Sequence, residues 1–110
     1  MYKKIILTKI LVTLFFLTFN AQATFIDGNT LMGYVKEEQR TGRSSEIFIG
    51  YIAGVHDSFN NFLICTPPNV TLGQLKAIVI KFMNENPEEW AKSGDYIVSV
   101  ALAETFSCKK

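Results

Sequence analysis

The sequence contains few of the side chains from which catalytic and metal sites are built. It has one histidine, His56, and only two cysteines, Cys65 and Cys108, so it cannot supply a full set of Cys and His ligands for zinc. Cys65 and His56, taken as a nucleophile and its base, would lie roughly 13 Å apart along a helix axis, too far for a hydrogen bond. The sequence also lacks a glycine-rich phosphate loop and a G-x-S-x-G motif. We therefore expect no enzyme activity, no catalytic residues, and no metal or other cofactor.

The sequence also lacks a strong excess of charge of either sign. Its 11 basic and 10 acidic residues are dispersed along the chain without a basic stripe. Nucleic-acid-binding proteins usually show such a stripe, and segments that bind a membrane surface show a polybasic patch. We therefore expect no nucleic-acid partner and no attachment to a membrane through surface charge.

Residues 1–23 have the features of a secretory signal peptide. A lysine-bearing start precedes an apolar run over residues 10–19, and Ala21-Gln22-Ala23 fits the small-x-small cleavage rule. The alternative is an uncleaved membrane anchor, but the apolar run is short for a span of about 20 residues. We expect cleavage after Ala23, which leaves residues 24–110 as a single domain in the bacterial periplasm with no stable membrane anchor.

The remainder of the chain follows the apolar spacing of amphipathic helices. Asp27 or Asn29 is placed to cap a first helix, and Ser44 or Ser45 a second. Capping boxes then occur at Thr71 with Gln74 and at Asn86-Pro87 with Glu89. The β-branched residues 96–100 suggest a strand as an alternative, but the flanking spacing is helical. The sequence predicts an all-α bundle of about four helices, over residues 29–39, 46–65, 72–84 and 86–106.

The second predicted helix carries two glycines in its interior. Gly50 and Gly54 lie four residues apart, and each costs about 1 kcal/mol against alanine, so we expect a bare backbone face that allows close packing. The helix is expected to end at Cys65, because Thr66-Pro67-Pro68 cannot continue it. In the third helix, Lys76 and Lys81 are expected to point away from the core.

The two cysteines favour a disulfide in an exported chain, with free thiols or an intermolecular bridge as the alternatives. A Cys65–Cys108 bridge needs Cα atoms about 4.4–6.8 Å apart, so it would bring the ends of the second and fourth helices together. We then expect those two helices to run parallel, with the third helix antiparallel between them.

Two loops are candidates for a surface that contacts a partner. Trp90 is either a core residue or an exposed anchor, and the acidic residues near it are either a solvated helix start or a contact for a basic partner. His56 and Asp57 are expected to be a polar pair on a helix flank. The candidate partner-binding residues are Asn84, Glu85, Asn86, Glu88, Glu89 and Trp90 after the third helix, and Thr66 and Asn69 after the second.

Several short motifs occur in order along the chain. They are Gly50-Tyr51-Ile52-Ala53-Gly54-Val55-x-Asp57, Cys65-x-Pro67, Val70-Thr71-x-Gly73-Gln74-Leu75, Asn86-Pro87-Glu88 and Ala101-Leu102-x-x-x-Phe106-x-Cys108. Together they resemble the Rap/Tai family, periplasmic immunity proteins against type VI secretion peptidoglycan amidases. The resemblance covers residues 28–108 and implies a small, exported, all-α protein, commonly dimeric. It also implies that such a protein binds a cognate amidase and blocks its Cys-His active site.

The same resemblance assigns structural roles to part of the motif set. It implies that Cys65 and Cys108 form the structural bridge of the family. The residues it implies to be mainly structural are Gly50, Tyr51, Gly54, Asp57, Pro67, Thr71 and Gln74. Many relatives carry two more cysteines, at positions that here correspond to Val35 and Phe48, so packing is expected to replace a second bridge.

The function expected from these observations is immunity. The chain would bind a cognate type VI secretion peptidoglycan amidase effector, inhibit it sterically, and so protect the cell from its own toxin, as a monomer or as a homodimer. The alternative is a general periplasmic helical protein with a binding or chaperone-like role that opens at low pH. A single histidine offers little support for such an acid switch.

Overall fold

The structure is a computed structural model that describes residues 2–17 and 24–109. These residues form five α-helices and one 3-10 helix, with isolated bridges but no β-strand, so the expected all-α class is confirmed. The cleavage site expected after Ala23 lies outside the described residues. The elements are α1 (Tyr2–Leu17), α2 (Gly28–Thr41), α3 (Glu46–Phe59), α4 (Leu72–Glu85), η2 (Pro87–Glu89) and α5 (Gly94–Thr105).

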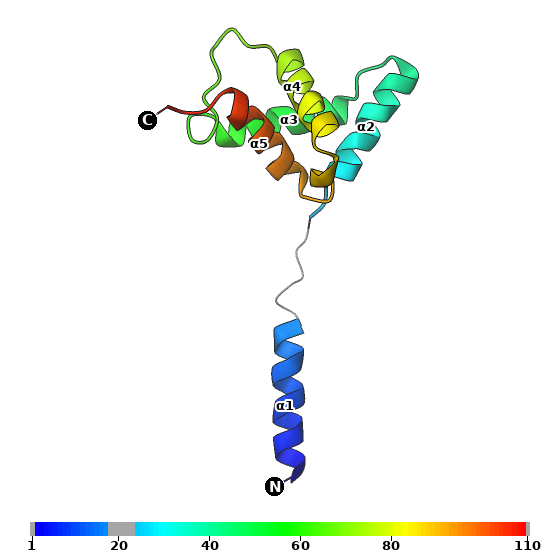
Figure 1. Cartoon of the computed structure of the whole chain (residues 1–110), viewed down its shortest axis with the longest axis vertical. Coiled ribbons are helices and arrows are strands. Elements are labelled where there is room, and N and C mark those ends of the chain that lie inside the picture. The colour runs from blue at the N-terminus through cyan, green and yellow to red at the C-terminus, as the bar shows by residue number, and fades with distance from the viewer. Residues whose placement is uncertain (1, 18–23, 110) are drawn as a thin grey trace.

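Helix α1 lies within the predicted signal peptide and stands apart from the other helices (Figure 1). It is 16 residues long. Over residues 2–17 and 24–109, no helix combines the length and the apolarity that a membrane crossing requires.

Helices α2 to α5 enclose one hydrophobic core. In α4 the buried side chains recur at every fourth position, because Leu75, Val79 and Met83 lie on the same face. Val35 and Phe48 are 2% and 0% exposed, so both side chains are packed in the core, as expected from the resemblance. The core residues are Leu31, Met32, Val35, Phe48, Ile52, Val55, Ile64, Leu75, Val79, Met83, Ile97, Val98, Ala101 and Leu102.

Side-chain caps begin the first three helices of the domain, as predicted. Asp27 Oδ1 accepts a hydrogen bond of 2.8 Å from the Thr30 amide, and the amide and hydroxyl of Thr30 lower the pKa of this carboxyl. Ser45 caps α3 through the amide of Phe48. At α4 both bonds of the capping box between Thr71 and Gln74 are present.

Helix α3 ends at Phe59, so the prediction that it continues to Cys65 is wrong. Asn61 adopts a left-handed conformation with φ 63°, which turns the chain out of the helix. The amides of Leu63 and Ile64 then donate to the Phe59 carbonyl oxygen, at 2.9 and 3.1 Å, and close a tight turn. Phe62 therefore fits the apolar spacing of α3 but lies outside the helix, and it is 80% exposed.

The fourth helix of the domain, α5, begins at Gly94 rather than at Asn86. Asn86 makes no side-chain cap for this helix, and its side-chain nitrogen donates to the Phe82 carbonyl oxygen at 2.8 Å. The helical start at Pro87 continues for only one 3-10 turn. The chain then pairs with the segment before α2: the Gly94 amide donates to the Ile26 carbonyl at 2.8 Å and opens a separate helix.

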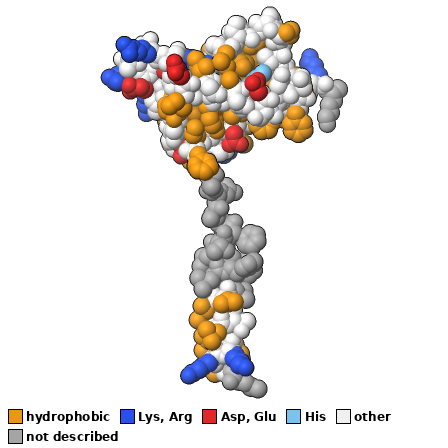
Figure 2. All heavy atoms as spheres, turned by 180° about the vertical axis from the view of Figure 1, so that it is seen from behind, with side chains coloured by type: hydrophobic (Ala, Val, Ile, Leu, Met, Phe, Trp, Pro, Cys, Tyr) orange, Lys and Arg blue, Asp and Glu red, His pale blue; other side chains and the backbone are white. Residues whose placement is uncertain are grey.

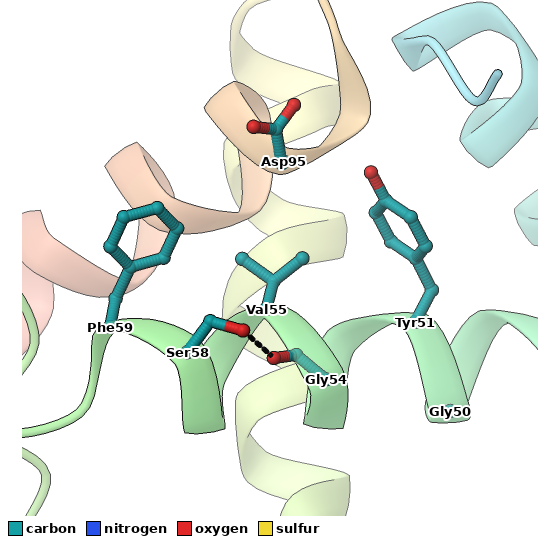
Figure 3. A pocket seen from close by; sticks show the side chains of 7 residues that line it. All are labelled: Gly50, Tyr51, Gly54, Val55, Ser58, Phe59 and Asp95. Atoms are coloured by element: carbon teal, nitrogen blue, oxygen red, sulfur yellow. Dashed lines mark hydrogen bonds between the residues drawn. The ribbon is translucent and has the colours of Figure 1, made fainter. Parts of the chain in front are cut away.

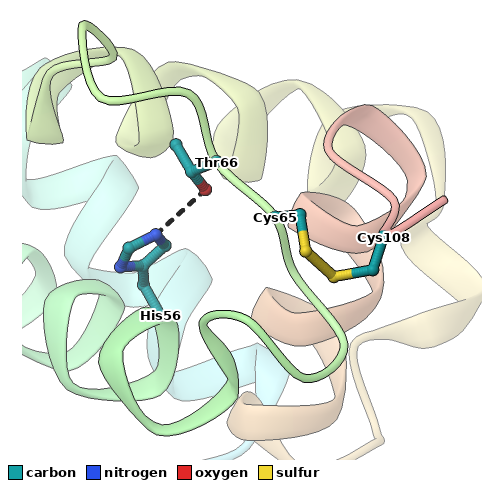
Figure 4. The surroundings of a disulfide bond; sticks show 4 residues. All are labelled: His56, Cys65, Thr66 and Cys108. Atoms are coloured by element: carbon teal, nitrogen blue, oxygen red, sulfur yellow. Dashed lines mark hydrogen bonds between the residues drawn. A yellow bond between two sulfur atoms is a disulfide. The ribbon is translucent and has the colours of Figure 1, made fainter.

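The disulfide is present, but its surroundings differ from the prediction. Cys65 and Cys108 are bonded, with their Cα atoms 4.9 Å apart, and they lie in the segments that follow α3 and α5 rather than at the helix ends (Figure 4). The expected up-down-up layout is correct only in part. Helices α3 and α5 run in the same direction, since Gly94 lies beside Tyr51 and Ser107 pairs with Ile64, but α4 crosses α3 instead of running antiparallel beside it (Figures 1 and 3).

Lys76 does not point into solvent as expected, whereas Lys81 does. The Lys76 ammonium lies 3.1 Å from Glu38 Oε2, with side-chain exposures of 18% and 13%. Glu38 Oε1 also accepts from the Ser45 amide at 2.6 Å, so the pair joins the end of α2 to the starts of α3 and α4.

Candidate partner-binding surface

The two loops proposed to contact a partner lie at opposite ends of α4. Thr66 and Asn69 precede this helix, while Asn84 to Trp90 follow its last turn. A 14-residue helix is roughly 21 Å long, so the two groups cannot form one small contact patch. Each loop is therefore described separately.

The acidic side chains after α4 are partly neutralised within the chain. Glu89 lies 2.6 Å from the Lys92 ammonium, and Glu85 lies 3.8 Å from Lys81. The hydrogen bond to Glu89, followed by that to Tyr96, raises the pKa of Lys92. Figure 2 shows acidic side chains scattered singly over the face in view rather than gathered in a patch. This loop offers little net charge to a basic partner.

Trp90 is engaged inside the domain. Its indole Nε1 donates to the Met83 carbonyl oxygen at 2.8 Å, and the Lys36 ammonium lies 5.8 Å from the ring centroid. The ring is half-buried and packs against the core. These contacts favour the core interpretation of Trp90 over that of an exposed anchor.

The loop after α3 presents apolar side chains to solvent instead. Phe62 and Leu63 are 80% and 42% exposed, and we call them the Phe62–Leu63 tip. The next residue, Ile64, is fully buried, and the Cys65 amide donates to the Phe106 carbonyl oxygen at 2.7 Å. Two exposed apolar side chains are thus held on a turn that is anchored directly behind them.

Helical spacing concealed this tip in the sequence. Phe62 fits the apolar periodicity of α3, whose buried residues include Phe48 and Val55, so spacing alone would place it on the buried face. The consecutive asparagines Asn60 and Asn61 are the available signal, because asparagine tolerates the left-handed conformation that ends the helix here.

The second half of the same loop is held to α3 by His56. Its Nε2 lies 3.0 Å from Thr66 Oγ1, and its Nδ1 lies 3.0 Å from Asp57 Oδ1 (Figure 4). An ionised carboxylate only accepts, so Nδ1 carries a proton, and in the neutral imidazole Nε2 then accepts from the Thr66 hydroxyl. His56 and Asp57 are a polar pair, as expected, with the additional role of fixing Thr66.

This chain of contacts has the connectivity of a hydrolase triad, but its surroundings differ. Triad carboxylates are buried where they orient the imidazole, whereas the Asp57 side chain is 80% exposed. Thr66 joins a loop to a helix through this bond. The arrangement therefore holds the loop against α3.

A hollow of about 590 Å³ lies between α3 and the start of α5 (Figure 3). Gly50 and Gly54 form part of its wall, and a Cβ built at either glycine would have open space around it. The close packing expected at these glycines is thus absent among the described residues. The hollow is lined by Gly50, Tyr51, Gly54, Val55, Ser58, Phe59 and Asp95.

Tyr51 connects the hollow to the start of α5. A Cβ at Gly94 would lie 2.9 Å from the Tyr51 hydroxyl, so Gly94 permits this close approach. Burial, followed by the charge of Asp95, raises the pKa of Tyr51, partly offset by a hydrogen bond with the Asp95 backbone. Tyr51 thus packs against the start of α5.

These features define a class of protein: a small, disulfide-tied helical domain whose surface loop after α3 is held by a disulfide and hydrogen bonds. Over residues 2–17 and 24–109, no group of three or more His, Cys, Asp or Glu side chains is placed to hold a metal ion. A family model described as Rap1a immunity proteins matches residues 27–108, and the chain belongs to this family. No curated protein and no solved structure matches the chain.

Proposed function

We propose that this protein is a periplasmic immunity protein that binds a cognate type VI secretion peptidoglycan amidase and inhibits it sterically. Membership of the Rap1a immunity protein family supports a role in immunity to a secreted effector. The signal-peptide features of residues 1–23 and the Cys65–Cys108 disulfide both suit an oxidising, extracytoplasmic compartment.

The observation that carries the inhibitory mechanism is the exposed Phe62–Leu63 tip. Interfaces are dominated by a few buried anchors, among which aromatic side chains are common. A turn that is already fixed by Ile64 and the disulfide loses little conformational entropy when it binds. We infer that the tip enters the substrate cleft of the amidase, while Thr66 and Asn69 contribute polar contacts at the rim.

Inhibition in this proposal requires no chemistry from the immunity protein. The tip excludes substrate and water from the cleft, so no proton or covalent bond is transferred by this chain. The residues Asn84 to Trp90 lie at the far end of α4 and would form at most a second, separate contact.

The test is substitution of the tip in the exported, disulfide-bonded protein. Phe62→Ala is expected to weaken binding to the amidase encoded beside this gene by at least about 30-fold, the loss typical of an interface hot spot. Because Phe62 is 80% exposed, the substitution should leave the free energy of unfolding unchanged. Calorimetric affinity and inhibition of peptidoglycan cleavage provide the measurements.

Phe25→Ala is the matched control, because Phe25 is also an exposed phenylalanine, at 96%, but lies outside the tip. Equal losses from both substitutions would contradict the assignment of the tip. Failure of the native protein to bind any neighbouring effector would contradict the immunity function. Acid-triggered binding of an apolar dye would favour the chaperone-like alternative instead.

A homodimer forms a second part of the proposal, and the bare face of α3 is the surface that would support it. Two helices can approach closely where side chains are missing, and Gly50 and Gly54 leave such a gap beside the hollow. Gly54→Gln should therefore convert a dimer into a monomer without unfolding it. Sedimentation velocity measures this, and a native protein that is monomeric at micromolar concentration would refute the dimer.

A further inference from the structure

The segment before α2 forms a second hollow with the start of α5. This hollow has a volume of about 260 Å³, and it shares Tyr51 and Asp95 with the larger hollow on α3 (Figure 3). The segment is held in place by backbone bonds of 2.8 Å from Gly94 to Ile26 and of 2.9 Å from Gly28 to Lys92. The lining residues are Thr24, Phe25, Ile26, Tyr51, Ser93 and Asp95.

Asp95 supplies a negative charge to this hollow. Its carboxylate is close enough to Tyr51 to contribute to the raised pKa of that hydroxyl. None of the residues that line either hollow is a lysine, arginine or histidine. Among residues 2–17 and 24–109, Asp95 also makes no ion pair within 4.0 Å. The site therefore presents an acceptor for a cation that none of the described residues provides.

We propose that this cation is the α-amino group that signal-peptide cleavage creates on Thr24, bound in the hollow beside the Asp95 carboxylate and the Tyr51 hydroxyl. Cleavage after Ala23 would make Thr24, which already lines the hollow, the first residue of the mature chain. An α-amino group has a pKa of about 7.7–8.0 and is charged at neutral pH. The inference rests on the proposed processing and is independent of which effector is bound.

The consequence is a difference between precursor and mature protein. In the precursor the Thr24 nitrogen is an uncharged peptide amide, so the ion pair with Asp95 forms only after processing. The new pair would fasten the segment before α2 to the start of α5 at the edge of the hollow on α3. Cleavage would then stabilise the domain as well as separate it from the signal peptide.

The experiment removes the amine chemically from the exported mature protein. Periodate cleaves the Cα–Cβ bond of an N-terminal threonine: the α-carbon becomes an aldehyde, acetaldehyde and ammonia leave, and periodate is reduced to iodate. Internal threonines have no free amine and do not react. Mass spectrometry of the product reports directly whether Thr24 is the N-terminal residue.

Oxidation is expected to lower the Tm of the native protein by roughly 1–5 °C, the range for an exposed ion pair in a domain of this size. In Asp95→Asn the same oxidation should leave Tm unchanged, because the amine has already lost its partner. This comparison also removes the separate effect of Asp95 on the α5 helix dipole. Thr24→Ala keeps the amine but resists periodate, so it controls for oxidation elsewhere, and Glu104→Gln controls for loss of a distant α5 carboxylate.

The pH dependence provides a second readout. Pairing with Asp95 raises the folded-state pKa of the amine above its unfolded value, so the stabilisation is present below about pH 8 and is lost as pH rises through the folded pKa. The groups facing the amine are Asp95 from α5 and Tyr51 from α3, and the raised pKa of Tyr51 keeps it neutral in this window. The proposal would be overturned by a protein that resists periodate, or by equal effects of oxidation in native and Asp95→Asn proteins.

Discussion

At the scale of single residues, the pair of Glu38 and Lys76 shows how two polar side chains connect three helices, α2, α3 and α4. Glu38 accepts from the Ser45 amide as well as from Lys76, and Lys76 also lies 3.3 Å from Ser44 Oγ. Hydrogen bonds on several sides compensate the desolvation of both charges. Removing one partner leaves the other charge half-satisfied in a poorly solvated site.

Lys76→Met is therefore expected to destabilise the domain by about 1–3 kcal/mol, less than for a fully buried pair because some solvent reaches both side chains. Chemical denaturation measures this loss. Lys81→Met is the matched control on the same helix, since Lys81 is 77% exposed, and it should change the free energy of unfolding by less than about 0.5 kcal/mol. Equal effects of the two substitutions would show that the pair with Glu38 contributes nothing.

At the scale of elements, the sequence predicted the capped helix starts but neither the end of α3 nor the start of α5. The caps at Asp27, Ser45 and Thr71 are local, because a side chain reaches an amide only a few residues away. The end of α3 depends on the left-handed Asn61, and the start of α5 depends on pairing between Gly94 and Ile26. Apolar periodicity carries no information about either event.

The glycines provide a prediction at this same scale. Gly54→Ala should stabilise the monomer by up to about 1 kcal/mol, because alanine favours the helix and its Cβ would meet open space. Gly28→Ala should instead destabilise it by about 1–3 kcal/mol, since a Cβ there would lie 2.6 Å from the Trp90 backbone and would also collide with Ile97 Cδ1.

Urea denaturation at low protein concentration separates the two glycine variants from any effect of association. A destabilised Gly54→Ala protein would contradict the open space beside α3. A Gly28→Ala protein as stable as the native one would mean that the Trp90 backbone can move away from α2 at little cost.

At the scale of the whole molecule, the site was harder to predict than the class. Helical content and the disulfide partners follow from composition and local motifs, which is why the sequence identified them. The exposure of Phe62 depends on how α3 stops and on where Ile64 packs, and both are properties of the assembled domain. The separation of the two candidate loops likewise appears only when α4 is placed between them.

The disulfide links the loop that carries the Phe62–Leu63 tip to the segment after α5. Replacing Cys65 and Cys108 by serine should cost about 4 kcal/mol, the loop-closure entropy for a sequence separation of 43. Measured by denaturation, this loss should equal that of native protein treated with reductant, which serves as the control. Binding of the amidase should also weaken under conditions where both forms remain folded, because the Phe62–Leu63 tip would lose the anchor behind Ile64 and become more costly to order. Unchanged affinity in the folded serine variant would mean that Ile64 and the bond from Cys65 to Phe106 hold the tip without the covalent link.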